Sequence, residues 1–158
     1  RVQDVAFLGF QIFRKKIRIS PKAQKRFKDR VRRLTRRNNG QSMARNIQDL
    51  SEYLRGWVGY FRIQEFRTIL GKLDGFVRSR LRSMQLKKWK KPKKFQRMMI
   101  LAGYPVEEAK RTWVKMDRWQ SVARRPVRFV LNLKWFRRRG LLFLDDFTPQ
   151  NLKLTFAR

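Results

Sequence analysis

Residues 53–62 read YLRGWVGYFR and place two glycines, a tryptophan and two arginines in a segment with helical periodicity. Glycine in a helix interior costs roughly 1 kcal/mol relative to alanine, so these glycines need a compensating reason. The apolar residues in and before this stretch recur every three or four positions and share about 100° of arc. They are Met43, Ile47, Leu50, Leu54, Trp57, Val58 and Phe61. This spacing predicts a helix that begins near Ser42 and buries that face.

The two flanks of this predicted helix differ. Arg55, Gly59 and Arg62 fall on one flank, and Tyr53 and Tyr60 fall on the other. A glycine between two arginines would let a sugar-phosphate backbone approach closely while the arginines bind its phosphates. The glycines could equally admit a closely packed neighbouring helix, and the sequence leaves both interpretations open.

The charge of the chain indicates its class of partner. Lys and Arg number 42 against 11 Asp and Glu, which gives a net charge of +31 on 158 residues. Such a chain repels itself unless an acidic polymer neutralises it, and nucleic acid is the commonest such polymer, followed by anionic membrane. The hydrophobic content of 42% and the aromatic content of 13% predict a folded core beneath the charge. The length allows one domain, or one domain with appendages.

Several residue types are absent from the sequence. It contains no cysteine and no histidine, which excludes disulfides, thiolate and imidazole metal sites, and catalysis by Ser-His or Cys-His pairs. No apolar run approaches the roughly 20 residues of a membrane span, and the first residues do not resemble a signal peptide. We therefore expect a soluble or surface-bound chain. Because it begins with Arg1 and its first methionine is Met43, we expect a fragment or processed product of something larger.

The N-terminal third predicts a β-hairpin followed by a helix. Residues 5–13 are rich in aromatic and β-branched side chains, residues 14–16 are basic, and residues 17–20 alternate with period two. Ser20 followed by Pro21 is a typical helix start. Apolar side chains then recur at helical spacing until residues 38–40, which read NNG and predict the helix end.

A third helix is predicted from Phe66 to about Met84, with Arg67, Arg78 and Arg82 opposite its apolar stripe. Three such helices make a bundle. Arg80 projects from the apolar stripe itself. It either snorkels where the helix outruns its core, which we favour, or reaches inward to a ligand phosphate.

Residues 86–94 read LKKWKKPKK and predict a linker. Trp89 within this run could stack on a base between phosphate contacts, or dock onto the bundle. Beyond it, residues 95–101 predict a short helix ended by Gly103, and Pro105 marks the next helix start.

Residues 127–136 fit either a strand or a helix. The preceding Pro126, the following arginines at 137–139 and the subsequent Gly140 favour a helix.

Residues 143–146 read FLDD and match the aromatic-x-Asp-Asp pattern of polymerase metal sites. The pattern is short, it lies downstream of the predicted bundle, and no third carboxylate stands on a convincing upstream strand. We interpret it as a chance match, and we expect Asp145 and Asp146 to solvate a turn or to pair with nearby arginines.

Six motifs together resemble the C-terminal part of group II intron-encoded reverse transcriptases, also called maturases. In order they are FLGF at 7–10, SPK at 20–22, LTRRNNG at 34–40, LRGWVGYF at 54–61, LDGFVRSRLR at 73–82 and KKWK at 87–90. The resemblance spans residues 5 to about 120 and weakens after Gly103.

The resemblance implies that residues 7–10 close the palm near the primer grip. It also implies that residues from about 20 to 90 form the thumb, or maturase domain X, a helical bundle that binds intron RNA to assist splicing and embraces the template-primer duplex. The fingers and the catalytic aspartates of the palm should precede Arg1. Mg²⁺ is expected at that polymerase site of the full-length protein, and no cofactor is expected in this chain. The tail lacks the Cys/His pattern of the family's endonuclease appendage.

We therefore predict a mainly α fold, a helical bundle preceded by a short β-hairpin and followed by further helices. The predicted divisions are residues 1–19 as the end of the palm, 20–91 as the thumb or maturase domain, and 92–158 as a basic helical extension. The chain should not be an enzyme on its own, although its parent should be a reverse transcriptase. Its expected partners are structured intron RNA, a template-primer duplex and the rest of the polymerase, with no membrane, in the bacterial cytoplasm or an organelle.

The candidate RNA-binding residues are mostly cations of the predicted helices and of the lysine run, and no residue is assigned to catalysis or metal binding. They are Lys25, Arg26, Arg33, Arg36, Arg37, Arg55, Gly59, Arg62, Arg78, Arg82, Lys87, Lys88, Trp89, Lys90 and Lys91. Three alternatives remain: a structural RNA-binding protein of the ribosomal type, a small polymerase that uses Asp145 and Asp146, and a membrane-surface protein.

Overall fold

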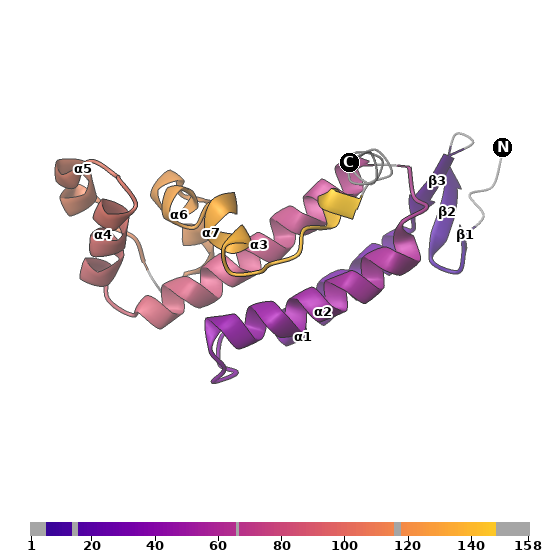
Figure 1. Cartoon of the computed structure of the whole chain (residues 1–158), viewed down its shortest axis with the longest axis horizontal. Helices are drawn as coiled ribbons and strands as arrows, with labels where there is room; N and C mark the ends of the chain where they lie inside the picture. The colour runs from indigo at the N-terminus through magenta and orange to yellow at the C-terminus, as the bar shows by residue number, and fades with distance from the viewer. Residues whose placement is uncertain (1–5, 14–15, 66, 116–117, 148–158) are drawn as a thin grey trace, which may run out of the picture.

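The computed structural model describes residues 6–13, 16–65, 67–115 and 118–147 (Figure 1). The fold is mainly α, as predicted, with a small antiparallel sheet before the helices. In Figure 1 the sheet lies at one end of the long helices, and α4 and α5 lie at the opposite end. None of the described helices has the length and apolar character needed to cross a membrane.

The sheet has three strands in the order β1, β2, β3: Ala6–Phe7, Phe10–Phe13 and Lys16–Ile19. The predicted hairpin is confirmed in β2 and β3, where Phe10 pairs with Ile19. The first arm of this hairpin is not one continuous strand over residues 6–13, because the chain turns at Leu8 and Gly9, both with positive φ. A Cβ on Gly9 would lie 3.2 Å from the ring of Phe61, so this turn needs glycine for space as well as for φ.

Helices α1 (Pro21–Leu34) and α2 (Met43–Phe61) form an antiparallel pair. Each begins where its sequence signal predicted. Ser20 Oγ accepts a hydrogen bond from the N–H of Ala23, and Ser42 Oγ accepts one from the N–H of Arg45. Their apolar stripes face each other, with the ring of Phe27 4.6 Å from that of Trp57.

Helix α3 (Arg67–Trp89) runs five residues beyond its predicted end at Met84. Its last turn is not a linker, because Leu86 is fully buried and Trp89 is 6% exposed. The ring of Trp89 lies 5.6 Å from that of Phe95 in α4 (Pro92–Leu101). The linker interpretation was therefore wrong: the lysines between these apolar residues are the solvent face of a helix.

The C-terminal segment comprises α5 (Val106–Arg111), η1 (Trp119–Ala123), α6 (Arg125–Val130), α7 (Leu133–Arg137) and η2 (Leu144–Phe147). The helix predicted over residues 127–136 is correct in type, but it breaks at Leu131 and restarts with Asn132 as N-cap of α7. In Figure 1 this segment folds back along α3 toward the sheet. Its buried side chains join the core cluster of the three long helices. The division into residues 1–19, 20–91 and 92–158 stays a prediction.

Candidate nucleic-acid interface

The cations of the chain greatly exceed the carboxylates that could neutralise them. Even if each of the 11 Asp and Glu residues paired with one cation, 42 − 11 = 31 cations would remain. Among the described residues, the ion pairs of Arg32 with Asp29 and of Arg45 with Asp49 lie on the surface, where both arginine side chains are more than half exposed. The excess positive charge is therefore available to an external anion.

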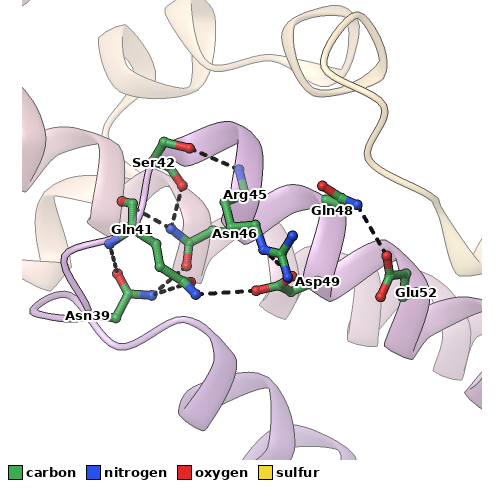
Figure 2. A network of polar contacts seen from close by, with 8 residues as sticks. All are labelled: Asn39, Gln41, Ser42, Arg45, Asn46, Gln48, Asp49 and Glu52. Carbon is green, nitrogen blue, oxygen red and sulfur yellow. Dashed lines mark hydrogen bonds and ion pairs between the residues drawn. The ribbon is translucent and has the colours of Figure 1, made fainter.

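The loop between α1 and α2 is held by a polar network (Figure 2). The side chain of Asn46 is fully buried and donates to the carbonyl oxygen of Ser42 at 2.7 Å. Its own Oδ1 accepts from the side chain of Asn39, whose Oδ1 in turn accepts from the N–H of Gln41 at 3.2 Å. Because these bonds fix the loop from inside, the cations next to it have a defined frame.

Arg36, Arg37, Asn38, Asn39 and Arg80 line a pocket of about 590 Å³ beside this loop. Arg80 reaches it from α3. Its Nε donates to Thr35 Oγ1 at 3.1 Å and its Nη2 donates to the carbonyl oxygen of Thr35 at 3.0 Å. Neither predicted role for Arg80 describes this arrangement, because the guanidinium binds the C-terminal end of α1. Burial, followed by the charges of Arg32 and Arg37, lowers the pKa of Arg80.

The lysines at the end of α3 meet the same loop. The ammonium group of Lys87 donates to Asn38 Oδ1, and that of Lys88 donates to the carbonyl oxygen of Gln41. We call Arg36, Arg37, Arg80, Lys87 and Lys88 the loop-end surface. Arg33, in the last turn of α1, and Lys90 and Lys91, which follow α3, are also exposed.

Trp89 does not belong to this surface. Because it is 6% exposed and packs on Phe95, its ring has no face free for a base, and of the two predicted roles docking onto the protein is correct.

The flank of α2 that carries Arg55, Gly59 and Arg62 is exposed. Within the described part of the chain, no packing neighbour lies within 4 Å of the position that a Cβ would take at Gly59 or at Gly56. The prediction that these glycines admit a close helix was therefore wrong. Open space at Gly59 leaves the other interpretation, close approach of a ligand backbone, as a prediction.

Arg26 and Lys25 lie near the start of α1, at the sheet end of the helix pair. Arg26 lines a groove with Tyr53, Trp57 and Tyr60, and the hydroxyl of Tyr60 donates to the carbonyl oxygen of Leu8 at 2.9 Å. This groove is on the tyrosine flank of α2, away from Arg55 and Arg62. The predicted cations thus do not form one continuous row.

Arg78 and Arg82 face the C-terminal segment. Arg82 is 9% exposed, and its Nε donates to the carbonyl oxygen of Leu131 at 3.0 Å. Arg78 lies 5.6 Å from the ring of Phe143. Arg125 and Arg128, which are not among the candidate RNA-binding residues predicted from the sequence, line a pocket with these two arginines. The basic spacing around Pro126 was the only local signal for them.

Comparison with known families indicates which class of basic protein this chain resembles. Residues 24–101 match the family model described as "Group II intron, maturase-specific domain". This part of the chain is a group II intron maturase-specific domain. The matched region includes all of α2, α3 and α4 and most of α1, as the sequence resemblance predicted. A search of curated proteins found no significant match.

The loop-end surface lies entirely inside the maturase domain, and so do Arg55, Gly59 and Arg62. Arg125 and Arg128 lie outside it, on the segment that folds back against α3. The maturase domain therefore supplies two of the four arginines in the pocket with Arg78 and Arg82, and the C-terminal segment supplies the other two.

The FLDD motif forms part of the contact between the maturase domain and the C-terminal segment. Both carboxylate oxygens of Asp146 accept from the guanidinium of Arg137, at 2.8 and 3.0 Å, which confirms the predicted pairing with an arginine. The N–H of Asp145 donates to Asp74 Oδ2 at 3.0 Å. Within the described ranges, no group of three or more potential metal ligands gathers at this motif or elsewhere.

Proposed function

We propose that the maturase domain binds structured group II intron RNA through its loop-end surface and through the exposed flank of α2, and thereby assists splicing. The observation that supports this most directly is the convergence of five cations from α3 and from the loop between α1 and α2. Arg36, Arg37 and Arg80 line one pocket, and Lys87 and Lys88 bind the loop beside it. Folded RNA presents regularly spaced phosphates along a wide minor groove, and rigid rows of cations recognise it by shape and charge.

The fixed frame of the loop adds to this argument. A flexible basic tail would pay a large ordering cost on binding, whereas the loop-end cations start from defined positions. Burial and like charges lower the pKa of Arg80, and an RNA phosphate in the loop pocket would offset that repulsion.

The proposal extends to the parent protein. We infer that this chain is the thumb region of a reverse transcriptase, that it grips the template-primer duplex there, and that catalytic aspartates and Mg²⁺ belong to the part of the parent before Arg1. On this proposal the protein acts in the bacterial cytoplasm or in an organelle, without chemistry of its own in this chain.

The test compares RNA binding by the 158-residue chain and by a variant with Arg36→Gln, Lys87→Gln and Lys88→Gln. The matched control is Lys93→Gln, Lys94→Gln and Arg97→Gln, which removes three exposed cations from α4. We expect the loop-end variant to bind a group II intron transcript at least tenfold more weakly than the control. Its affinity should also depend less steeply on salt, since each phosphate contact contributes a slope of about 0.9 for a duplex.

Two outcomes contradict the proposal. Equal losses in the two triple variants would mean that net charge alone attracts RNA. Tighter binding of a ribosomal RNA fragment than of an intron transcript of equal length would favour a structural RNA-binding protein of the ribosomal type.

A further inference from the structure

A second pocket lies on the other side of α3, where the C-terminal segment covers that helix. Four arginines line it: Arg78 and Arg82 from α3, and Arg125 and Arg128 from α6. Its volume is about 630 Å³, large enough for more than a single phosphate group. Because the two pairs of arginines come from segments more than 40 residues apart, the pocket exists only where the C-terminal segment packs on α3.

The arginines of this pocket are held in place on the protein side. The Nε of Arg82 donates to the carbonyl oxygen of Leu131, and its guanidinium lies 5.7 Å from the ring of Phe136. The guanidinium of Arg78 lies against the ring of Phe143. Contacts with the protein thus fix the positions of Arg78 and Arg82, two of the four cations. An anion site needs this kind of preorganisation.

The charges around Arg82 are of one sign. Burial and then the charges of Arg78 and Arg128 lower its pKa to about 10. The charges of Asp74 and Asp145 act in the opposite direction on the pKa of Arg78. The carboxylate of Asp74 also accepts hydrogen bonds from the backbone N–H groups of Leu144 and Asp145 at η2. The mutual repulsion of Arg78, Arg82 and Arg128 would be relieved by a bound anion.

The remaining lining residues indicate which anion. Phe129 is 41% exposed and Leu133 is 50% exposed, so an open aromatic ring and an aliphatic side chain stand beside the guanidinium groups. Exposed aromatic rings next to cations suit single-stranded nucleic acid, whose bases stack while its phosphates pair with arginine. A duplex keeps its bases paired and cannot offer one to the ring.

We propose that the pocket between α3 and α6 binds an unpaired nucleotide of the RNA, with its phosphate on Arg78, Arg82, Arg125 and Arg128 and its base against Phe129. This inference rests on the proposed RNA-binding function, and it assigns the C-terminal segment a direct role in recognising unpaired RNA. The loop-end surface would contact folded RNA, and this pocket would select a single-stranded position.

The first experiment separates stacking from charge. Phe129→Leu keeps an apolar side chain against Tyr104, whose ring lies 5.0 Å from that of Phe129, and changes no charge. We expect its affinity for a ten-nucleotide single-stranded RNA to fall roughly tenfold, as loss of one stacked base predicts, with unchanged affinity for a blunt RNA duplex. Equal effects on both RNAs, or no effect on either, would overturn the proposal.

The second experiment tests the arginines from the C-terminal segment. Arg125→Gln with Arg128→Gln is compared with Arg111→Gln and Arg138→Gln, which removes the same charge from exposed positions of that segment. The pocket variant should lose more affinity for the single strand than the control, and its salt slope should fall by up to about 0.7, the contribution of one single-strand phosphate. Equal loss in both variants would overturn the assignment.

Two further measurements locate the ligand and its source. A single-stranded RNA carrying 4-thiouridine should photo-crosslink to the peptide that contains Phe129, and crosslinks confined to other peptides would overturn the proposal. Adenosine monophosphate should compete far more weakly than the oligonucleotide, and equal competition would mean a free-nucleotide site instead. The loop-end variant leaves the pocket between α3 and α6 unchanged. The test of the loop-end surface and the tests of this pocket can therefore fail independently of each other.

Discussion

Asp74 of α3 accepts a hydrogen bond of 3.0 Å from the backbone N–H of Leu144, 70 residues further along the chain. Its second carboxylate oxygen accepts from the N–H of Asp145 at the same distance. Asp74 is 3% exposed, so this one side chain binds the start of η2 to the maturase domain in a water-poor setting. Several consequences for stability and binding depend on contacts of this kind.

The first prediction concerns pH. Burial raises the pKa of Asp74 from 3.8 to about 6, against the opposing effect of its two backbone hydrogen bonds. A carboxyl whose pKa is higher in the folded state binds its proton more tightly there, so its contribution to stability is present near pH 4 and is lost as the pH rises through about 6. The free energy of unfolding, measured by urea denaturation, should therefore fall over this range and level off above it.

Asp74→Asn should remove that pH dependence, because asparagine does not titrate. It should also destabilise the fold by about 1–3 kcal/mol, since one backbone N–H of η2 would face an amide donor rather than an acceptor. Asp29→Asn, at an exposed ion pair, is the control and should change stability by less than about 1 kcal/mol. A wild-type profile that is flat between pH 4 and 7 would refute the raised pKa.

The second prediction concerns the contact between Arg80 and Thr35. Thr35→Val removes the hydroxyl that donates to the carbonyl oxygen of Val31 and accepts from Arg80 Nε. Because Thr35 is fully buried, thermal or urea denaturation should show a loss of about 1–3 kcal/mol. Arg36→Gln, an exposed neighbour, should stay within about 0.5 kcal/mol. Comparable effects of the two substitutions would mean that the contact adds nothing.

The third prediction concerns Gly59. Since the space at Gly59 is open, Gly59→Leu should leave stability unchanged or raise it by up to about 1 kcal/mol through helix propensity. The affinity for intron RNA should nevertheless fall, because the added side chain stands between Arg55 and Arg62. Gly56→Leu is the matched control: its position is equally open, but it is turned about 100° from Arg55 on the helix. Equal RNA affinity in the two variants would exclude close approach at Gly59.

The fourth prediction concerns Trp89. Trp89→Ala should cost about 3–5 kcal/mol in the free energy of unfolding, because a buried indole is lost from the contact between α3 and α4. Affinity for RNA per folded molecule should not change. Trp113→Ala, at a residue that is 61% exposed, should have little effect on stability. A variant of Trp89 that folds normally but binds RNA weakly would restore the base-stacking role.

The elements that the sequence predicted well are those with local signals. Ser20 and Ser42 cap the helices that follow them, because a cap is a contact over three residues. The end of α3 was missed for a local reason too: Leu86 and Trp89 continue the helical spacing, but the lysines around them have the composition of a linker.

The candidate site was only partly predictable, because its geometry depends on contacts distant in sequence. Arg80 meets Thr35 across 45 residues, and Arg82 meets Leu131 across 49. Helical periodicity places each arginine on a face, but it does not say which segment covers that face. For the same reason it could not group Arg78 and Arg82 with Arg125 and Arg128.

The way the C-terminal segment lies on α3 bears on how this protein should be cut for study. A recombinant piece ended at Leu101, where the family match stops, would strip the partners from Asp74 and Arg82 and open the covered side of α3 to water. The family match ends at Leu101, whereas buried side chains as far along the chain as Leu144 belong to the same hydrophobic core.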